Sequence, residues 1–210
     1  GMGINYFRRD GRDTKFVLFE HLGLEKLLTY EAYKDFGLDD FSMIIDEALK
    51  VCREVVGPTM QDGDIQGCSY ENGVVKVPPS FHDCWKFMAE NGWISLSNSP
   101  QYGGQGLPAA MGGLVTEFFC GANMSLIVYT GLAVANGRVI ESFGTEEDKA
   151  LFCEKMYTGV WGGTMCLTEP HCGTDLGMLR TKAEPQPDGS YKLTGTKIFI
   201  SSGEHDMAEN

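Results

Sequence analysis

A repeating pattern of apolar residues first becomes clear after residue 38. Between Asp39 and Val56, apolar side chains recur at spacings of three and four, which is the period of one helix face, and Gly57-Pro58 ends the pattern. The apolar positions are Phe41, Ile44, Ile45, Ala48, Leu49, Cys52, Val55 and Val56. The sequence therefore predicts an amphipathic helix. The preceding stretch, residues 4–36, is mixed and favours a short helix or two in an N-terminal extension.

Further helices are predicted along the next hundred residues. Pro79 suits a first helical turn, and Asn91-Gly92 ends the apolar run that follows it. A loop rich in glycine and proline covers residues 95–107. Helices are then expected over Pro108–Ala122 and from about Ser125 to Phe143. Between the first two helices, residues 62–72 are polar and contain glycine, whereas residues 73–78 suit a short extended piece.

The last predicted helix begins at Thr145 and ends at Tyr157. Thr145 is followed by Glu146 and Glu147, and acidic residues in a first turn favour the helix dipole. The hydroxyl of Thr145 is a typical N-cap group. This helix should therefore start where the preceding one stops, at Gly144.

After Gly159 the pattern changes from helical to strand-like. Short apolar runs cover Trp161–Thr168, Thr181–Glu184 and Tyr191–Ile200, and Asp188-Gly189 indicates a hairpin turn between the last two. Helices thus come first and strands second, which predicts an α+β chain. We place an N-terminal extension at 1–38, a helical domain at 39–158 and the first part of a β domain at 159–210.

Composition and charge narrow the possible functions. The 210 residues hold 29 Asp and Glu against 17 Lys and Arg, giving a formal net charge of −12. An acidic surface repels phosphate backbones, so a dedicated nucleic-acid binder is excluded. No uninterrupted apolar run approaches the roughly 18 residues of a membrane span, and no charged start followed by an apolar stretch indicates a signal peptide. A cytoplasmic protein is expected.

The cysteine pattern argues against both disulfides and metal binding. The number of cysteines is odd, and none lies in a CxxC pair or in a zinc-like arrangement with histidines. We therefore expect reduced thiols and no metal site. The seven cysteines are Cys52, Cys68, Cys84, Cys120, Cys153, Cys166 and Cys172.

The segment richest in candidate chemistry is Met165–Asp175, with the sequence MCLTEPHCGTD. A strand-like run ends at Thr168, a turn begins at Pro170, and Gly173-Thr174 offers backbone N–H groups and a hydroxyl in a tight curve. Consecutive amides of this kind can cradle an anion such as a phosphate. On the residues alone, a plain turn explains the segment equally well.

The same segment resembles the first signature of the acyl-CoA dehydrogenase family, in which Ser/Thr precedes Glu and Gly-Ser/Thr-Asp follows. Further blocks of the family occur in the same order, from Asp39 to the chain end. They are the Pro100–Leu107 loop with Tyr102-Gly103-Gly104, the Gly144-Thr145 junction, Thr181-Lys182-Ala183-Glu184 and the run from Leu193 to Ser201. The resemblance implies a helical bundle followed by the start of a β-barrel-like middle domain, with a C-terminal helical domain outside this chain.

The resemblance implies FAD as the cofactor and assigns residues to its site. The residues implied are Met165, Cys166, Leu167, Thr168, Gly173, Thr174, Phe199, Ile200 and Ser201. Leu167 and Thr168 would donate backbone and hydroxyl hydrogen bonds where negative charge accumulates on reduced flavin. Thr174 would also lie near the CoA substrate. Met165, Cys172 and Phe199 depart from the residues usual in the family, but none of the three should prevent flavin binding.

The implied reaction is α,β-dehydrogenation of an acyl-CoA thioester to the trans-2-enoyl-CoA. The family's base is a glutamate of the C-terminal domain, expected beyond Asn210, so no catalytic residue is assigned within this chain. Electron-transfer flavoprotein is the implied electron acceptor, and a homo-oligomer is expected. The longer subgroup that this chain resembles includes enzymes for 3-(methylthio)propanoyl-CoA, which makes that thioester one candidate substrate. An acyl-CoA oxidase and a non-catalytic flavin- or CoA-binding helical module remain alternatives.

Three other features have more than one interpretation. The predicted helix segment Val128–Arg138 is rich in small residues, including Gly131. In the family this helix borders the acyl channel, so Gly131 is a candidate substrate-binding residue, but close helix packing explains small residues equally well. Glu169 is interpreted as an anchor for its loop, and His171 as a loop or surface residue rather than a catalytic base.

Overall fold

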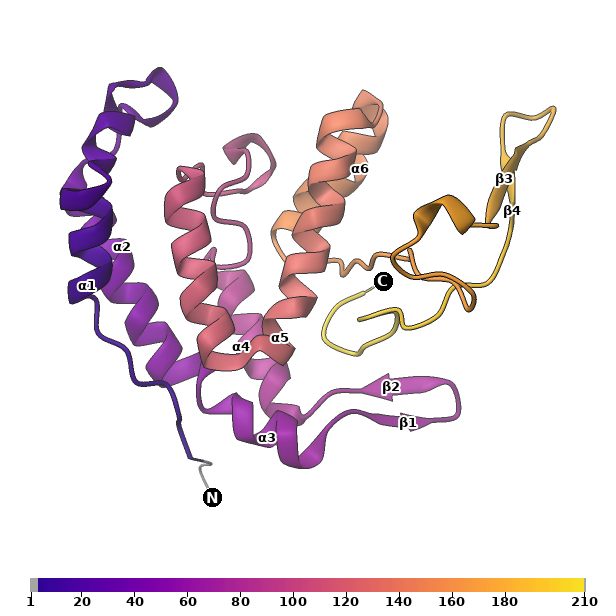
Figure 1. Ribbon diagram of the computed structural model, residues 1–210, viewed down its shortest axis with the longest axis horizontal. Coiled ribbons are helices and arrows are strands. Elements are labelled where there is room, and N and C mark those ends of the chain that lie inside the picture. Colours follow the sequence, from indigo (N-terminus) through magenta and orange to yellow (C-terminus); the bar gives the residue numbers. More distant parts are fainter. Residues whose placement is uncertain (1–3, 210) are drawn as a thin grey trace.

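Helices form most of the first three quarters of the protein, with one small hairpin between the third and fourth α-helices, and a second hairpin follows the last helix (Figure 1). The computed structural model describes residues 4–209. The helices are α1 (Arg12–Lys15), α2 (Leu38–Val51), α3 (Thr59–Gln66), α4 (Pro79–Glu90), α5 (Ala109–Phe143) and α6 (Glu146–Tyr157), and the strands are β1 (Ser69–Glu71), β2 (Val74–Lys76), β3 (Lys182–Pro185) and β4 (Tyr191–Thr194). The predicted order of helices first and strands second is confirmed.

The core lies between α2, α4 and α5. The predicted apolar face of α2 is buried, with Phe41 and Ile45 fully enclosed, and a π-helical turn over Cys52–Val56 continues it to Gly57. From α4, Phe81 and Trp85 enter the same core. Each large apolar side chain buried in this way stabilises the fold by about 1.5–3 kcal/mol. The amphipathic pattern therefore predicted both the helix and the face that it buries.

Helix α5 contains a break that separates the two helices expected from the sequence. Asn123 has φ −162° and ψ 89°, which is not helical, and its side chain is buried. Its amide Nδ2 donates to the Thr59 hydroxyl at 2.8 Å, and its Oδ1 accepts from the Ser125 hydroxyl at 2.7 Å and from the Leu126 N–H. Asn123 thus caps the second half of α5, as an N-cap residue does.

By length and composition, α5 could cross a membrane, which the sequence pattern did not lead us to expect. Its most apolar 18-residue stretch has a mean hydropathy of 1.6, and half of that stretch is buried inside the fold. The core helix of a globular protein has the same properties, because a helix that packs on several sides is apolar on several sides. The burial of α5 against α2, α3 and α6 accounts for its composition.

The ends of α6 and the N-terminal extension follow the predictions. Thr145 accepts a hydrogen bond from the Asp148 N–H, and the Asp148 carboxylate accepts from the Thr145 N–H and hydroxyl, which lowers the pKa of Asp148. In the extension, α1 continues into a π-helical turn over Phe16–His21, and Leu18 and Leu24 are buried in the common core. The extension is therefore part of the packed helical layer.

One expectation about extended structure was confirmed and one was wrong. The short extended piece expected at residues 73–78 contains β2, which pairs with β1 across the left-handed turn residues Asn72 and Gly73. Residues 161–168 form no ladder, apart from a single bridge between Trp161 and Glu209. Periodicity does not distinguish an extended loop from a strand, because the ladder depends on a partner segment.

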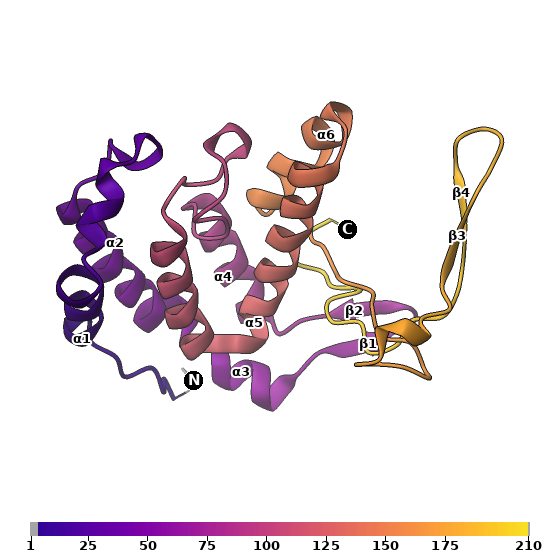
Figure 2. The same cartoon turned by 45° about the horizontal axis from the view of Figure 1, so that its top comes forward.

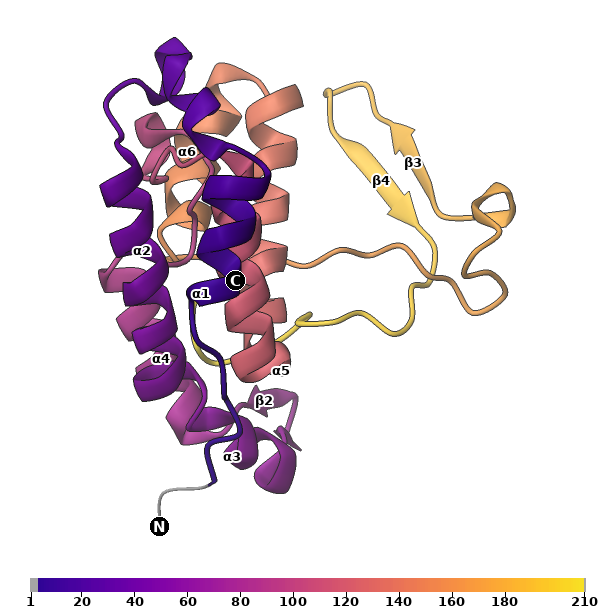
Figure 3. The same ribbon diagram turned by 60° about the vertical axis from the view of Figure 1, so that its left-hand side comes forward.

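The β3–β4 hairpin is present, but its second strand ends early. Lys182 pairs with Thr194 and Pro185 with Tyr191, and the predicted Asp188-Gly189 turn has Gly189 at φ 84°. Strand β4 stops at Thr194 because Gly195, at φ 158°, approaches Thr181 so closely that a Cβ would lie 2.2 Å from its hydroxyl. The hairpin stands apart from the helical layer (Figures 2 and 3).

The small residues of α5 divide into two groups, which gives a matched test of the packing. A Cβ on Gly137 would lie 2.5 Å from the Tyr157 ring of α6, whereas a Cβ on Gly131 meets no atom within 4 Å. We predict that Gly137→Ala lowers the free energy of unfolding by about 1–3 kcal/mol through overpacking. Gly131→Ala should raise it by up to about 1 kcal/mol, since alanine favours helix. Thermal unfolding of both variants checks this, and equal melting temperatures would contradict it.

Candidate functional site

The loop that follows α6 is tied to helix α5 and to the segment after β4. Asn136 on α5 donates to the Thr164 carbonyl at 2.9 Å, and the Thr164 hydroxyl donates to the Ser201 carbonyl. Further along, the Ile198 N–H donates to the Thr168 carbonyl at 3.0 Å. These bonds place residues 164–168 beside residues 198–201. The two segments that the sequence assigned to one cofactor site are therefore adjacent in the fold.

Glu169 holds this arrangement together. Its carboxylate is 3% exposed and accepts from the backbone N–H groups of Arg180 at 2.8 Å and Thr181 at 2.9 Å. The Lys197 ammonium donates to it at 3.0 Å and to the Leu167 carbonyl at 2.9 Å. One carboxylate thus joins the signature loop to the start of β3 and to the segment after β4. The interpretation of Glu169 as a loop anchor is confirmed.

These donors keep Glu169 ionised. Hydrogen bonds from Thr181 and from the Arg180 N–H, together with the one from Lys197, hold the pKa of Glu169 well below its usual range. A lowered carboxyl pKa adds stability above the unfolded-state value, and that stability is lost as the pH falls through the folded-state value. The loop anchor is therefore fully formed near neutral pH.

The predicted cofactor residues lie on the open side of this anchored loop. Leu167, Thr168 and Ile200 are half-buried, and the other six are exposed, namely Met165, Cys166, Gly173, Thr174, Phe199 and Ser201. Within residues 4–209, the N–H groups of Leu167 and Thr168 and the hydroxyls of Thr168, Thr174 and Ser201 donate no hydrogen bond to the chain. They are donors available to a ligand.

The same two segments carry two exposed apolar side chains. Met165 is 62% exposed and Phe199 is 88% exposed. Phe199 also has φ 56°, a left-handed conformation that is uncommon for a bulky residue. Backbone strain of this kind concentrates at binding and catalytic sites. Unpaired donors together with two exposed apolar side chains match a flat heteroaromatic ligand with carbonyl and ring-nitrogen acceptors, which is the chemistry of a flavin ring.

His171 and Cys172 complete a cluster with Glu169 in which three potential metal-ligand atoms lie within 4.8 Å of one another. The Glu169 oxygens already accept from two N–H groups and from the Lys197 ammonium. A cation would have to displace that ammonium or lie beside it. His171 itself is exposed, and its Nε2 lies 2.8 Å from the Met178 carbonyl oxygen, as expected of a loop residue.

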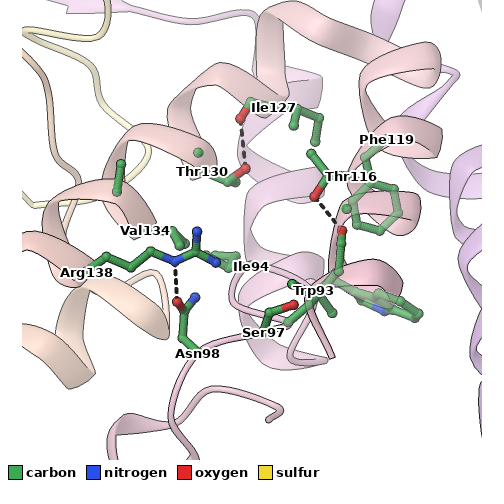
Figure 4. A pocket seen from close by; sticks show the side chains of 16 residues that line it. Trp93, Ile94, Ser97, Asn98, Thr116, Phe119, Ile127, Thr130, Val134 and Arg138 are labelled. Atoms are coloured by element: carbon green, nitrogen blue, oxygen red, sulfur yellow. Dashed lines mark hydrogen bonds between the residues drawn. The ribbon is translucent and has the colours of Figure 1, made fainter. Parts of the chain in front are cut away.

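A cavity of about 490 Å³ lies along one face of α5, within the roughly 300–1,000 Å³ range of small-molecule sites. Figure 4 shows its walls, formed by α5 and by the loop that precedes it. The lining residues are Trp93, Ile94, Leu96, Ser97, Asn98, Ala109, Gly112, Gly113, Thr116, Phe119, Ile127, Thr130, Gly131, Val134, Ala135 and Arg138. Most of the lining is apolar or small.

The small residues of α5 were interpreted either as the border of an acyl channel or as sites of close helix packing, and the cavity shows which residues fit each interpretation. Gly131 lines it with open space beside it, as the acyl-channel interpretation requires, whereas Gly137 packs against Tyr157. Thr174, the other predicted substrate residue, does not line this cavity. The structure therefore does not bring Gly131 and Thr174 into one pocket.

Two features of this region were not predicted from the sequence, namely the place of Arg138 in the cavity wall and the burial of His205. Arg138 lines the cavity and donates through Nε to the Asn98 side chain at 2.6 Å. Its spacing from Ile127, Gly131 and Val134 is that of one helix face, so the helical period could have placed it there. His205 is buried between Trp85 and Tyr129, with ring centroids 5.8 and 5.0 Å away.

The segment around His205 returns the chain to the helices. Burial lowers the pKa of His205, although the nearby Asp206 opposes this shift. Asp206 accepts from the Val77 N–H at 2.9 Å and lies 3.1 Å from His82 Nε2. No short-range pattern signals these contacts, because they join residues more than a hundred positions apart.

Comparisons with known proteins agree with this architecture. A profile of the acyl-CoA dehydrogenase N-terminal domain matches residues 39–160. The chain is 38% identical over 204 residues to 3-methylmercaptopropionyl-CoA dehydrogenase of Ruegeria pomeroyi, covering 95% of this chain and 34% of that protein. It therefore spans about a third of the length of the curated relatives it matches.

Solved structures give the same result. Butyryl-CoA dehydrogenase from Megasphaera elsdenii superposes with a TM-score of 0.64 at 26% identity, covering 80% of this chain and 43% of that one. An FAD complex of PigA superposes with a TM-score of 0.65 at 26% identity, covering 80% and 42%. With the signature loop, the helical layer and the matched profile in agreement, the chain belongs to the acyl-CoA dehydrogenase family.

Proposed function

We propose that this chain forms the flavin-binding and acyl-binding front part of an FAD-dependent acyl-CoA dehydrogenase. The observation that carries the proposal is the pairing of residues 164–168 with residues 198–201, two segments that together carry unpaired donors and the exposed side chains of Met165 and Phe199. The solved structures that this chain resembles include an FAD complex of PigA. The acceptor-rich edge of a flavin suits those donors.

The residues proposed to hold FAD are those on the open side of the anchored loop. The N–H groups of Leu167 and Thr168 and the Thr168 hydroxyl would donate to the flavin ring, and Gly173 and Thr174 would lie near a phosphate. Hydrogen-bond donors that are already in position before the reaction stabilise the transition state most when they face the developing charge. Bound here, FAD would accept the hydride that leaves the β carbon of the substrate.

The cavity along α5 is proposed to take the acyl group. Its Gly131 and Ala135 leave room, while Trp93, Ile94 and Phe119 exclude water from an alkyl chain. None of the sixteen lining residues described is a carboxylate that could remove the α proton. The carboxylate base is proposed to come from outside these 210 residues, as in the family.

The wider setting is also a proposal. We infer a cytoplasmic homo-oligomer that passes electrons to an electron-transfer flavoprotein. The seven free cysteines support a reducing compartment. The resemblance to the family supports the choice of acceptor.

The first prediction tests the activity itself. The full-length protein should purify with bound FAD and should oxidise acyl-CoA thioesters anaerobically with an electron-transfer flavoprotein or an equivalent dye as the acceptor. Hydrogen peroxide released in air at a rate matching the anaerobic rate would instead assign an oxidase. Protein without flavin that takes up none from solution would favour a non-catalytic module.

The second prediction concerns the width of the cavity. Gly131→Leu should place a side chain in the open space beside this glycine. The value of kcat/KM should then fall about tenfold or more for long or branched acyl groups and less for butyryl-CoA. Val139→Leu on the exposed outer face of α5 serves as the control and should change neither value. Equal losses for all chain lengths would show that Gly131 does not set the cavity width.

A further inference from the structure

Arg138 is the one charged side chain among the sixteen described residues that line the α5 cavity. Figure 4 shows its side chain reaching toward Asn98, and the residue as a whole is exposed. In the second half of α5 the lining residues run from Ile127 to Arg138, about 16 Å along the helix axis. Arg138 therefore places a solvent-accessible cation at the end of this mostly apolar stretch.

The position of this guanidinium is fixed by a chain of buried polar groups. Its Nε donates to Asn98 Oδ1 at 2.6 Å, and the Asn98 amide donates in turn to the Ser95 hydroxyl at 2.6 Å. Asn98 and Ser95 are both buried. An arginine held through Nε keeps its two terminal amino groups in a fixed fork, and such a fork matches a carboxylate geometrically.

Nothing in the described part of the chain neutralises Arg138. Its terminal amino groups form no hydrogen bond there, and no carboxylate forms an ion pair with it. Glu141, one turn further along α5, instead accepts the Tyr157 hydroxyl at 2.5 Å. An alkyl chain that filled the cavity would cover the guanidinium without replacing its water, which costs free energy.

We propose that the cavity binds acyl groups that carry a second hydrogen-bond acceptor besides the thioester carbonyl, with Arg138 as the residue that selects it. A carboxylate is the best match, because it adds opposite charge to the two N–H donors. Methylene groups between the two acceptors would lie along Gly131 and Val134. This inference rests on the proposed acyl-CoA dehydrogenase function and specifies its substrate class.

The test compares acyl-CoA pairs of equal carbon number on the full-length holoenzyme, one with a terminal carboxylate and one with a terminal methyl, such as hexanedioyl-CoA and hexanoyl-CoA. The wild type should give the higher kcat/KM with the carboxylate at one or more chain lengths. Arg138→Met should lower that value about tenfold or more and leave the methyl-ended partner unchanged or improved. Arg138→Lys should recover part of the loss.

Lys50→Met, on the exposed side of α2, removes the same charge at a position away from the cavity and serves as the control. It should leave kcat/KM unchanged for both acyl-CoA substrates of a pair. Equal losses for both members in Arg138→Met would overturn the proposal and assign Arg138 to CoA binding or to positioning Asn98. A wild type that prefers methyl-ended chains at every length would also overturn it, whether or not the variant folds. Oxidation of no acyl-CoA at all would instead refute the proposed function together with this inference.

Discussion

The ion pair between Glu169 and Lys197 is the interaction on which the candidate cofactor site depends. The segments it joins lie 28 positions apart and share one further backbone bond, from Ile198 to Thr168. The β3–β4 hairpin that connects them has exposed side chains on both faces and adds little apolar burial. The buried carboxylate accepts from three donors in two other segments of the chain, the N–H groups of Arg180 and Thr181 and the Lys197 ammonium. It therefore fixes the loop whose outer side carries the proposed flavin-binding residues.

Helix α5 contributes residues both to the hydrophobic core and to the lining of the cavity. The break at Asn123 divides the helix into two halves. The Asn123 side chain accepts a hydrogen bond from the Leu126 N–H at the start of the second half and donates one to the Thr59 hydroxyl. Beyond the break, Gly137 permits contact with α6, and Gly131, less than two turns earlier, leaves space for a ligand. Helix α5 is apolar enough for a membrane helix because it packs against other helices on several sides and lines a cavity on another side.

The sequence predicted those parts of the protein that depend on local pattern. The amphipathic face of α2, the Thr145 cap and the Asp188-Gly189 turn each follow from spacing or backbone preference within about ten residues. The strand limits near Thr168 and Thr194 did not follow, because a ladder requires a partner segment that periodicity does not reveal. Arg138 was not predicted as a cavity residue, because an exposed arginine on a helix has no local sequence signal that distinguishes it from other surface arginines, and its partner Asn98 lies 40 positions earlier.

The central claim is that one buried ion pair organises the cofactor site, and a double-mutant cycle on FAD affinity tests it most directly. FAD dissociation constants of the full-length protein would be measured for the wild type, Glu169→Gln, Lys197→Met and the double variant. The account predicts that each single change weakens FAD binding about tenfold or more and that the double variant is no weaker than the worse single one. Strictly additive losses, or unchanged affinity in Glu169→Gln, would contradict it.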